Sequence, residues 1–269
     1  MPQTINTNVV SLNAQRNLTT SQSSLATSMQ RLSSGLRVNS AKDDAAGLAI
    51  ADRMNAQVRG INVAIRNAND GVSLAQTAEG ALATMSDALQ RMRELAVQSL
   101  NGSNGTSDRA NLDTEFTALQ SEINRIAMQT KFNGVAIVGT GATTNTFQVG
   151  ANLNDTLTIT TSDVSTVVTG LAVSSVASAG AALTAIDTAL NTVNTQRAGY
   201  GAAMSRFSYA ISNLQISGEN QAAARGRIMD ADFAAETANL SRSQILQQAG
   251  TAMIAQANAL PNSVMTLLR

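Results

Sequence analysis

The sequence contains no cysteine and no histidine among its 269 residues. Without them the chain cannot form a disulfide, bind a metal through thiolate or imidazole, or use a cysteine–histidine or serine–histidine pair in catalysis. Aromatic residues make up only 3% of the chain, and tryptophan is absent. The core must therefore be built from Leu, Ile, Val, Met and Ala, which are the side chains that suit packing between helices.

An excess of charge of either sign is also missing, because 18 Lys and Arg residues balance 18 Asp and Glu residues. A neutral chain is a poor partner for nucleic acid, and its weak self-repulsion suits association. No apolar run is long enough to predict a membrane span. The first residues, MPQTINTNVV, do not resemble a cleaved secretory signal, so these rules alone predict a cytosolic protein unless another export route is used.

The central part of the chain shows the apolar spacing of a long coiled-coil helix. The stripe consists of Met54, Val58, Ile61, Ile65, Ala68, Val72, Ala75, Ala78, Leu82, Met85, Leu89, Met92 and Ala96. The steps are three and four residues, with a mean of about 3.5 rather than 3.6. This spacing predicts a helix from about residue 45 to about residue 100, roughly 80 Å long at about 1.5 Å per residue.

A second stripe of the same kind follows in the C-terminal half. It consists of Leu183, Ile186, Leu190, Val193, Arg197, Tyr200, Met204, Phe207, Ile211 and Leu214. Only Arg197 breaks its apolar character. The two stripes predict two long helices that pack against each other.

Both ends of the chain show thinner stripes, which predict helices for coiled-coil assembly. Their apolar positions are Leu18, Leu25, Met29 and Leu32 near the start, and Leu246, Met253, Leu260, Val264 and Leu267 near the end. The residues between them are largely Ser, Thr, Asn and Gln. Such stripes bury too little area to fold alone, so we expect these helices to be marginal until another surface covers them. Pro261 is expected to kink the last helix or to begin a new turn.

Turn signals mark the ends of these helices. Gly35 suits the C-terminal end of the first helix, and Ser40 and Asp43 have the spacing of a capping box before the next. The run NGSNGTSD at residues 101–108 predicts a turn, followed by a shorter helix with an apolar face between residues 112 and 126. Alternating residues in TNTFQVG and DTLTITT, joined by ANLND, predict a β-hairpin. The fold class is therefore mainly α, with long antiparallel coiled-coil helices, a small β-hairpin region and paired N- and C-terminal helices.

Helix capping explains the few candidate catalytic residues better than chemistry does. Asp43 and Asp44 are adjacent, so they do not face each other on a helix. Asp230 and Asp232 lack the glycine and the distant glutamate of a calcium-binding loop. Carboxylates are favoured at helix N-termini, where they accept hydrogen bonds from free backbone amides. We therefore predict no catalytic residue, no metal site and no cofactor.

Long ordered motifs resemble those of bacterial flagellin, the subunit of the flagellar filament. They are INTNVVSLNAQRNL at the start, then RLSSGLRVNSAKDDAAGLAIADRM, LQRMRELAVQ, QTKFNGV and FQVGAN, and SRSQILQQAGTAMIAQANALPNSVMTLLR at the end. They cover nearly the whole chain in the order of the family. Few residues separate the hairpin from the second long helix, so the chain resembles a short form that lacks the outer variable domains.

The resemblance implies a domain organisation. We expect an inner domain of terminal helices from residues 1–34 and 231–269, with linkers at residues 35–43 and 225–230. Residues 44–131 and 177–224 are expected to form an outer helical domain. Residues 132–176 are expected to form a surface-exposed β-hairpin region.

The resemblance also implies the protein's partners and location. Copies of the chain are expected to form a helical homopolymer whose terminal helices line concentric tubes. Further expected partners are the hook–filament junction and cap proteins, the flagellar export chaperone and the export apparatus, with no nucleic acid and no membrane. The family leaves the cell without a cleaved signal peptide, so the resemblance places the protein in the extracellular filament.

Two sets of residues match immune-recognition positions of the family. Gln90, Arg91, Leu95 and Glu115 match positions contacted by an animal Toll-like receptor. In the peptide at residues 30–51, Asp43 and Gly47 match positions to which a plant receptor kinase is sensitive. We expect the first set to be accessible on monomers and covered in filaments.

Three other classes of protein were weighed. A hook–filament junction protein shares the terminal motifs, but its middle does not usually carry LQRMRELAVQ together with KFNGV. A generic coiled-coil adhesin would explain the heptads but not the ordered motifs. An enzyme is disfavoured because the chain has no recognisable site and no room for an inserted catalytic domain.

Overall fold

The computed structural model describes residues 7–161, 163–164 and 168–267, and residues 260–267 by their backbone alone. Its described elements are α1 (Val9–Ser34), α2 (Ala45–Ser99), α3 (Thr106–Gln129), β1 (Lys131–Phe132), β2 (Val135–Ala136), β3 (Asn145–Gln148), β4 (Thr156–Ile159), α4 (Val176–Met229) and α5 (Phe233–Leu267). They form two compact units. Unit 1 takes the chain up to residue 56 and from residue 220 onward, and unit 2 takes residues 57–219.

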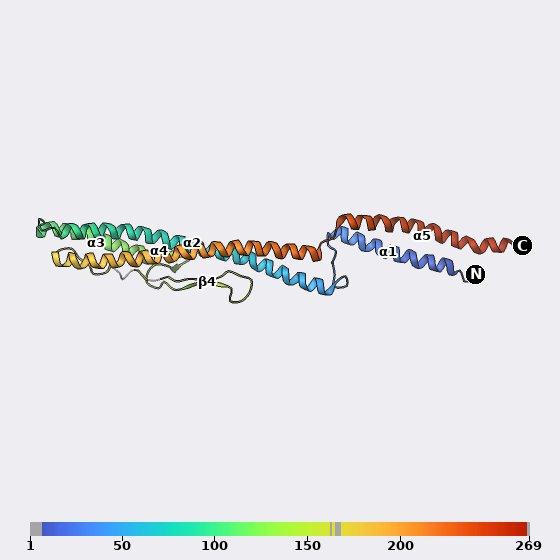
Figure 1. The fold of residues 1–269 in the computed structure, drawn as a ribbon, viewed down its shortest axis with the longest axis horizontal. Coiled ribbons are helices and arrows are strands. Elements are labelled where there is room, and N and C mark those ends of the chain that lie inside the picture. The colour runs from blue at the N-terminus through green and yellow to red at the C-terminus, as the bar shows by residue number, and fades with distance from the viewer. Residues whose placement is uncertain (1–6, 162, 165–167, 268–269) are drawn as a thin grey trace. The chain divides into compact units, whose positions relative to one another are not determined.

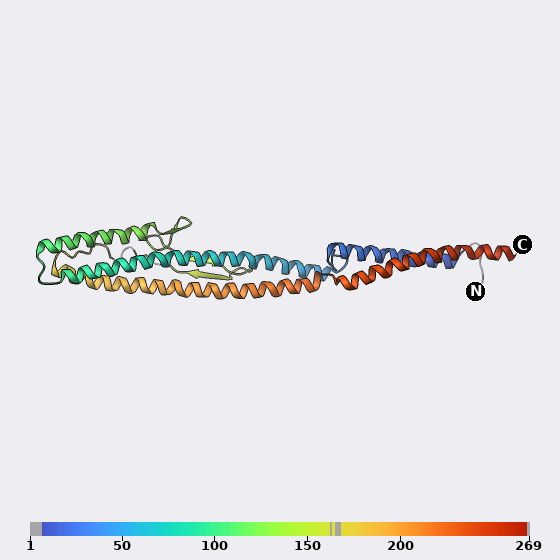
Figure 2. The same ribbon diagram turned by 90° about the horizontal axis from the view of Figure 1, so that it is seen from above.

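The two long helices are those that the apolar stripes predicted. α2 spans Ala45–Ser99, and every position of its predicted stripe is buried or half-buried. The same holds for the stripe on α4. Both views of the chain show α2 and α4 side by side in unit 2 (Figures 1 and 2). The predicted mainly α fold class is confirmed.

The core of unit 2 lies between these helices, α3 and the β region. Its largest fully buried side chains include Met85 and Leu89 of α2, Phe116 of α3 and Phe207 of α4. The β region, expected on the surface, also contributes fully buried side chains to this core: Ile137, Val138, Ile159, Val164, Val168 and Val173. A two-stranded hairpin needs a packed face to be stable, and the surface exposure expected for residues 132–176 stays a prediction for the other side chains of this region.

A glycine allows a core side chain to approach α2 closely. A methyl group on Gly71 would lie 2.7 Å from the ring of Phe207 on α4. The Phe207 ring also meets the edge of Phe147 on β3, with ring centres 5.6 Å apart and planes at 89°. Gly71 thus gives an aromatic pair room between the helices and the hairpin.

Two antiparallel strand pairs form in the β region. The predicted hairpin is confirmed: β3 pairs with β4, with Asn145 opposite Ile159 and Gln148 opposite Thr156. A second hairpin, β1–β2, was not predicted. Its turn is Asn133–Gly134, with φ values of 49° and 81°. Asn–Gly is the strongest short signal for such a turn, so the sequence did contain the information.

Ion pairs explain the charged break in the stripe of α4. Arg197 donates to Glu79 of α2 at 2.8 Å, and Arg93 of α2 donates to Asp187 of α4 at 2.7 Å. A guanidinium at a half-buried stripe position is tolerated because its stem packs while its head reaches the partner carboxylate. These pairs help to fix the register between the two helices.

In unit 1, the first and last helices pair as predicted. α1 and α5 run antiparallel, side by side (Figures 1 and 2). Gly35 ends α1 with a φ of 72°, as expected for a left-handed C-terminal residue. Next to it, the Arg37 amide donates to the Met229 carbonyl at 2.7 Å and the Ala231 amide donates to the Gly35 carbonyl at 2.9 Å. These bonds join the segment that follows α1 to the junction between α4 and α5.

Two local predictions were wrong. The Ser40–Asp43 pair closes a separate turn rather than starting α2, which is capped one residue later: Asp44 Oδ1 accepts from the Gly47 amide at 2.8 Å. Residues 225–229, expected in a linker, are the last residues of α4. Gly226 is the only helix-breaking residue between residues 225 and 229, and a single glycine does not end a long helix.

Candidate assembly and recognition surfaces

The seam between α1 and α5 is built mainly from small and polar side chains. Its buried or half-buried members on α1 are Asn8, Ser11, Ala14, Leu18, Ser21, Leu25, Ser28 and Leu32. On α5 they are Glu236, Asn239, Leu240, Ser243, Gln247, Gly250, Ile254 and Ala257. A methyl group on Gly250 would lie 3.2 Å from Leu18 Cδ1, so the two helices approach closely there.

Hydrogen bonds tie one end of this seam. Asn8 caps α1 by accepting from the Ser11 amide at 3.0 Å, and its own Nδ2 donates to the Ala257 carbonyl at 2.7 Å. The Ser11 hydroxyl donates to Asn258 Oδ1 at 2.8 Å. These contacts are directional rather than apolar, so they set the register of the pair more than its strength.

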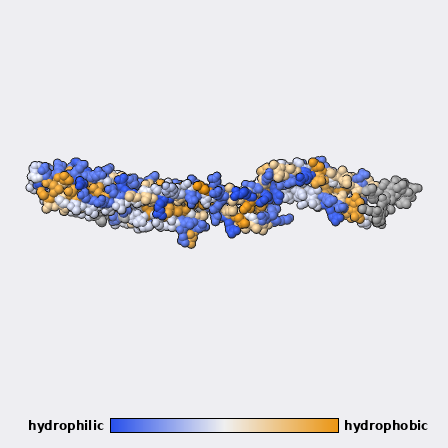
Figure 3. Space-filling view, viewed as in Figure 1, coloured by the Kyte–Doolittle hydropathy of each residue, from blue (hydrophilic) through white to orange (hydrophobic). Residues whose placement is uncertain are grey.

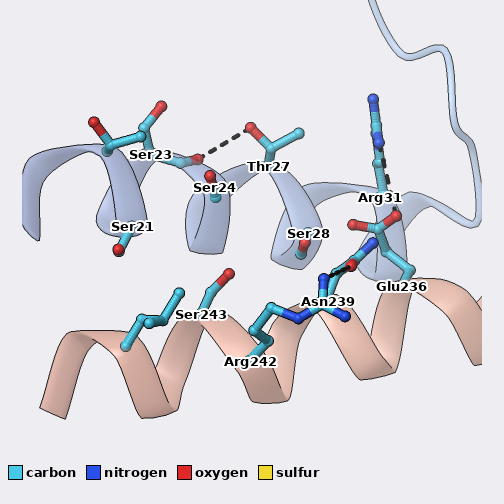
Figure 4. Close-up of a pocket in the computed structure, with 12 residues that line it drawn as sticks. Ser21, Ser23, Ser24, Thr27, Ser28, Arg31, Glu236, Asn239, Arg242 and Ser243 are labelled. Atoms are coloured by element: carbon cyan, nitrogen blue, oxygen red, sulfur yellow. Dashed lines mark hydrogen bonds and ion pairs between the residues drawn. The ribbon is translucent and has the colours of Figure 1, made fainter. Parts of the chain in front are cut away.

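A polar groove of about 460 Å³ lies along the seam farther from the chain ends. Ser28 of α1 and Ser243 of α5 point into it (Figure 4). Arg31 and Glu236 face each other across the groove with a long nitrogen–oxygen distance of 3.7 Å. Arg31 Nε is buried and has no hydrogen-bond partner among the described residues. The interior of this helix pair therefore contributes little apolar burial.

Other large apolar side chains of both helices are exposed to solvent. They are Val9, Val10, Leu12 and Met29 on α1, and Phe233, Ile245, Leu246 and Met253 on α5. Met253 is 63% exposed and Leu246 is 49% exposed. Part of this apolar surface is visible over α1 and α5 in Figure 3. Exposed apolar faces of this kind mark interaction sites.

The structure thus separates the residues that the thin stripes grouped together. Leu18, Leu25 and Leu32 are half-buried in the seam. Met29 and Met253 are exposed outside it, whereas Leu246 lines the polar groove with about half of its surface exposed. The side chains of Leu260, Val264 and Leu267 lie outside the described residues. The buried serines of the seam were missed, although small residues at heptad spacing are a signal for close helix packing.

Three of the four acidic residues that were considered for chemistry, Asp43, Asp44 and Asp232, cap turns and helices. Asp232 Oδ1 accepts from the Ala234 amide at 2.9 Å at the start of α5, as Asp44 does for α2. Asp43 accepts from the backbone amides of Ser40 and Asn39 at 2.9 and 3.1 Å. These bonds, that from Ser40 most of all, lower the pKa of Asp43. The described part of the chain contains no cluster of acidic residues that could hold a metal ion.

Gly47 lies beneath this capped turn. Its position is buried, and a methyl group there would lie 2.2 Å from Asp44 Oδ2. Any side chain at residue 47 would therefore displace the carboxylate that caps α2. Asp43, by contrast, is exposed. The two residues matched to plant recognition differ in accessibility within the folded chain.

Three of the residues matched to animal recognition, Gln90, Arg91 and Glu115, lie on the outer faces of α2 and α3. Arg91 forms ion pairs with Glu115 of α3 at 2.8 Å and with Glu94 at 2.9 Å. The hydrogen bonds that Arg91 donates to Glu94, and then to Glu115, raise the pKa of Arg91. Gln90 is exposed beside them, but Leu95 has no exposed surface. Leu95 packs in the core beneath this surface, so its expected contact with the receptor stays a prediction that its burial in the folded chain does not support.

No helix within the described ranges combines the length and the apolar character needed to cross a lipid bilayer.

Comparison with known proteins gives consistent matches along the chain. Residues 5–143 match the bacterial flagellin N-terminal helical region, and residues 183–268 match the bacterial flagellin C-terminal helical region. A flagellin of Halalkalibacterium halodurans is 45% identical over 270 aligned positions, covering 98% of this chain and 99% of that protein. A flagellin of Xenorhabdus nematophila is 42% identical and covers both chains fully.

A solved structure is also similar. The crystal structure of Bacillus cereus flagellin aligns with a TM-score of 0.53 and 34% identity, covering 60% of this chain and 94% of that chain.

Proposed function

The chain belongs to the bacterial flagellin family, and we propose that its copies polymerise through the outward apolar residues of α1 and α5. It is a structural subunit of the extracellular flagellar filament and not an enzyme. Its near-complete alignment with a relative of almost equal length identifies it as a short flagellin.

The contrast between the seam and the outer faces carries this proposal. Within the pair, Ser28 and Ser243 are buried while Leu246 and Met253 are exposed. Burying one large apolar side chain stabilises an assembly by about 1.5–3 kcal/mol. Covering these side chains in a neighbouring copy therefore supplies stability that the isolated helix pair lacks.

Substitutions on α5 test this surface. Leu246→Asn and Met253→Gln should raise the protein concentration needed for polymerisation while leaving the far-ultraviolet circular dichroism of unit 2 unchanged. Gln248→Ala and Gln256→Ala are matched controls, because both glutamines are exposed on the same helix. Sedimentation of polymer across a concentration series gives the readout. Polymerisation of the first two variants at wild-type concentrations would overturn the proposed surface.

The finer partners follow from the family. The filament subunit is proposed to contact the hook–filament junction and cap proteins at the ends of the polymer, and the export chaperone and export apparatus before assembly. Export is proposed to leave the N-terminus uncleaved. Intact-mass measurement of the secreted protein tests this, since loss of a leader would lower the mass.

The exposed cluster of Gln90, Arg91 and Glu115 is proposed to bind an animal Toll-like receptor. Its support is the accessible ion pair between α2 and α3, with both side chains about half exposed. Leu95 is proposed to act indirectly: its packing in the core holds α2 in place and so positions the exposed residues of the cluster. Assembly is proposed to cover this cluster, so that monomers activate the receptor and filaments do not.

A cell-based receptor assay with purified monomer tests this cluster. Arg91→Ala should lower potency without changing the melting temperature, because an exposed ion pair contributes only about 0–1 kcal/mol. Arg125→Ala is the matched control, since Arg125 forms a similar exposed ion pair with Glu122 on α3. Equal potency of Arg91→Ala and the wild-type protein would contradict the assignment.

Residues 30–51 are proposed to be recognised by a plant receptor kinase as a released peptide. Gly47 is buried in the folded chain, so a receptor that senses it requires the segment to be unfolded. The free peptide should therefore be active and its Asp43→Ala variant weaker, whereas intact folded protein should be inactive until proteolysis. Equal activity of intact protein under protease inhibition would refute the need for release.

The runner-up function is a hook–filament junction protein of the same family. Negative-stain electron microscopy of the polymerised protein separates the two. Long helical filaments support the filament subunit, whereas monomers or short caps support the junction protein.

A further inference from the structure

Three Asn–Gly pairs occur in unit 2, and two of them share one loop. Asn101–Gly102 and Asn104–Gly105 both lie between α2 and α3. The third, Asn133–Gly134, is a hairpin turn in which both residues have positive φ. Its backbone conformation therefore differs from that of the other two pairs, and it is not compared with them. The two pairs in the shared loop have identical dipeptide chemistry, and any difference between them comes from the fold.

The Asn101 side chain is held in a reactive arrangement. Its Oδ1 accepts from the Ser103 amide at 3.4 Å, so the side chain turns toward the backbone that follows it and closes a ring that contains the Gly102 nitrogen. A hydrogen bond to Oδ1 also makes the side-chain carbon Cγ a better electrophile. The Gly102 amide has no hydrogen-bond partner among the residues that the structure describes, and both residues are exposed.

Asn104 is restrained at both reacting groups. Its Nδ2 donates to the Gln98 carbonyl at 2.7 Å, which directs the side chain back toward the end of α2. The Gly105 amide donates to Asp108 Oδ2 at 2.9 Å, as part of the start of α3. Both bonds must break before the Gly105 nitrogen can reach the side-chain carbon of Asn104.

We propose that Asn101 is a site of spontaneous deamidation in the folded protein and that Asn104 is protected by the fold. The Gly102 nitrogen loses its proton to solvent base and attacks Asn101 Cγ. The Cγ–Nδ2 bond breaks and Nδ2 leaves as ammonia. The new bond between the Gly102 nitrogen and Cγ closes a succinimide ring. Water then opens either carbonyl–nitrogen bond of the ring, giving aspartate or isoaspartate, with no oxidation or reduction.

The product changes the loop that closes α3 onto α2. Arg109 donates to the Ser99 carbonyl at 3.0 Å and to the Asn101 carbonyl at 3.1 Å. Either product adds a negative charge, and isoaspartate also adds a carbon to the main chain at the residue that Arg109 holds. A neutral exposed loop thereby acquires charge as the protein ages.

Peptide mapping of the full-length protein tests the proposal. Trypsin cleavage after Arg93 and Arg109 releases residues 94–109, which contain both sites. After incubation at mildly alkaline pH, fragmentation mass spectrometry locates the conversion. Asn101 should convert about thirtyfold faster than Asn104, since two extra hydrogen bonds of about 1 kcal/mol each must break at Asn104.

Three controls separate the fold from the dipeptide. The same peptide without the rest of the chain should convert at both sites at similar rates. Asp108→Ala should accelerate conversion at Asn104 alone. Gly102→Ala should suppress conversion at Asn101 without unfolding, because a methyl group on Gly102 meets open space. Equal rates at the two sites in folded protein, or no conversion at Asn101 while the free peptide converts, would overturn the proposal.

Discussion

Single glycines in α2 serve different purposes, and their positions decide the effect of substitution. A methyl group on Gly71 would meet the Phe207 ring at 2.7 Å, whereas one on Gly80 meets nothing within 4 Å. Gly71→Ala should therefore destabilise unit 2 by about 1–3 kcal/mol, because the aromatic pair must shift. Chemical denaturation followed by circular dichroism measures this change.

Gly80→Ala is the matched control for that experiment. It lies exposed in the same helix, so it should stabilise the protein by up to about 1 kcal/mol through helix propensity. If both variants stabilise the protein equally, close packing of Phe207 against Gly71 is refuted.

The ionisation of Tyr200 makes the stability of the core depend on pH in the alkaline range. Its hydroxyl donates to the Ile137 carbonyl at 3.0 Å, and burial raises its pKa from 10.0 to about 12. The neutral form is favoured by folding, so its stabilisation is present below about pH 10 and is lost as pH rises through about 12.

Tyr200→Phe should lower the free energy of unfolding at neutral pH by about 1 kcal/mol, through loss of one hydrogen bond and an unpaired carbonyl. Its unfolding free energy should also fall less steeply than that of the wild-type protein between pH 10 and 12. Parallel curves for the two proteins would show that Tyr200 does not titrate in this range.

Some residue positions were predictable from the sequence and others were not. For apolar residues of α2 such as Leu82 and Met92, the spacing along the sequence is enough to predict that they are buried. Ser28 and Ser243 do not, because serine is usually exposed and only a partner helix brings them inside. Leu95 was placed on a receptor surface by family resemblance, but it is buried where the narrow coiled-coil stripe widens to meet α3.

At the scale of elements, the two helix pairs differ in how they are held. α2 and α4 fully bury large apolar side chains, whereas the buried residues of α1 and α5 include Ser11, Ser28, Glu236 and Ser243. Helices with few buried apolar contacts open at low free energy. Hydrogen–deuterium exchange of the soluble protein should therefore be fast in α1 and α5 and slow in the parts of α2 and α4 that belong to unit 2. Equal protection of both pairs would contradict this difference.

Element boundaries were predictable where a local signal agreed with packing. The limits of α2 were predicted to within a residue, because Asp44 and the turn after Ser99 both act locally. The β1–β2 hairpin was missed since its strands have two residues each, too few for an alternating pattern. The backbone of α5 is helical on both sides of Pro261, to Leu267, so the expected kink at Pro261 stays a prediction.

At the scale of the whole molecule, assembly and stability of the ends are linked. Limited proteolysis of the soluble protein should remove both ends first and leave unit 2. Filaments should resist, because the outer apolar faces of α1 and α5 are then covered and opening costs more. Mass spectrometry of a digestion time course on both forms measures this. Equal resistance of monomer and filament would refute the link.

The outward position of Ile245, Leu246 and Met253 also has a thermal consequence. Burial of apolar surface lowers the heat capacity and is driven mainly by entropy near room temperature. Joining copies through these side chains should therefore become more favourable on mild warming and weaker on cooling. A calorimeter should record a negative heat-capacity change for polymer growth, and filaments should shed subunits in the cold before unit 2 unfolds.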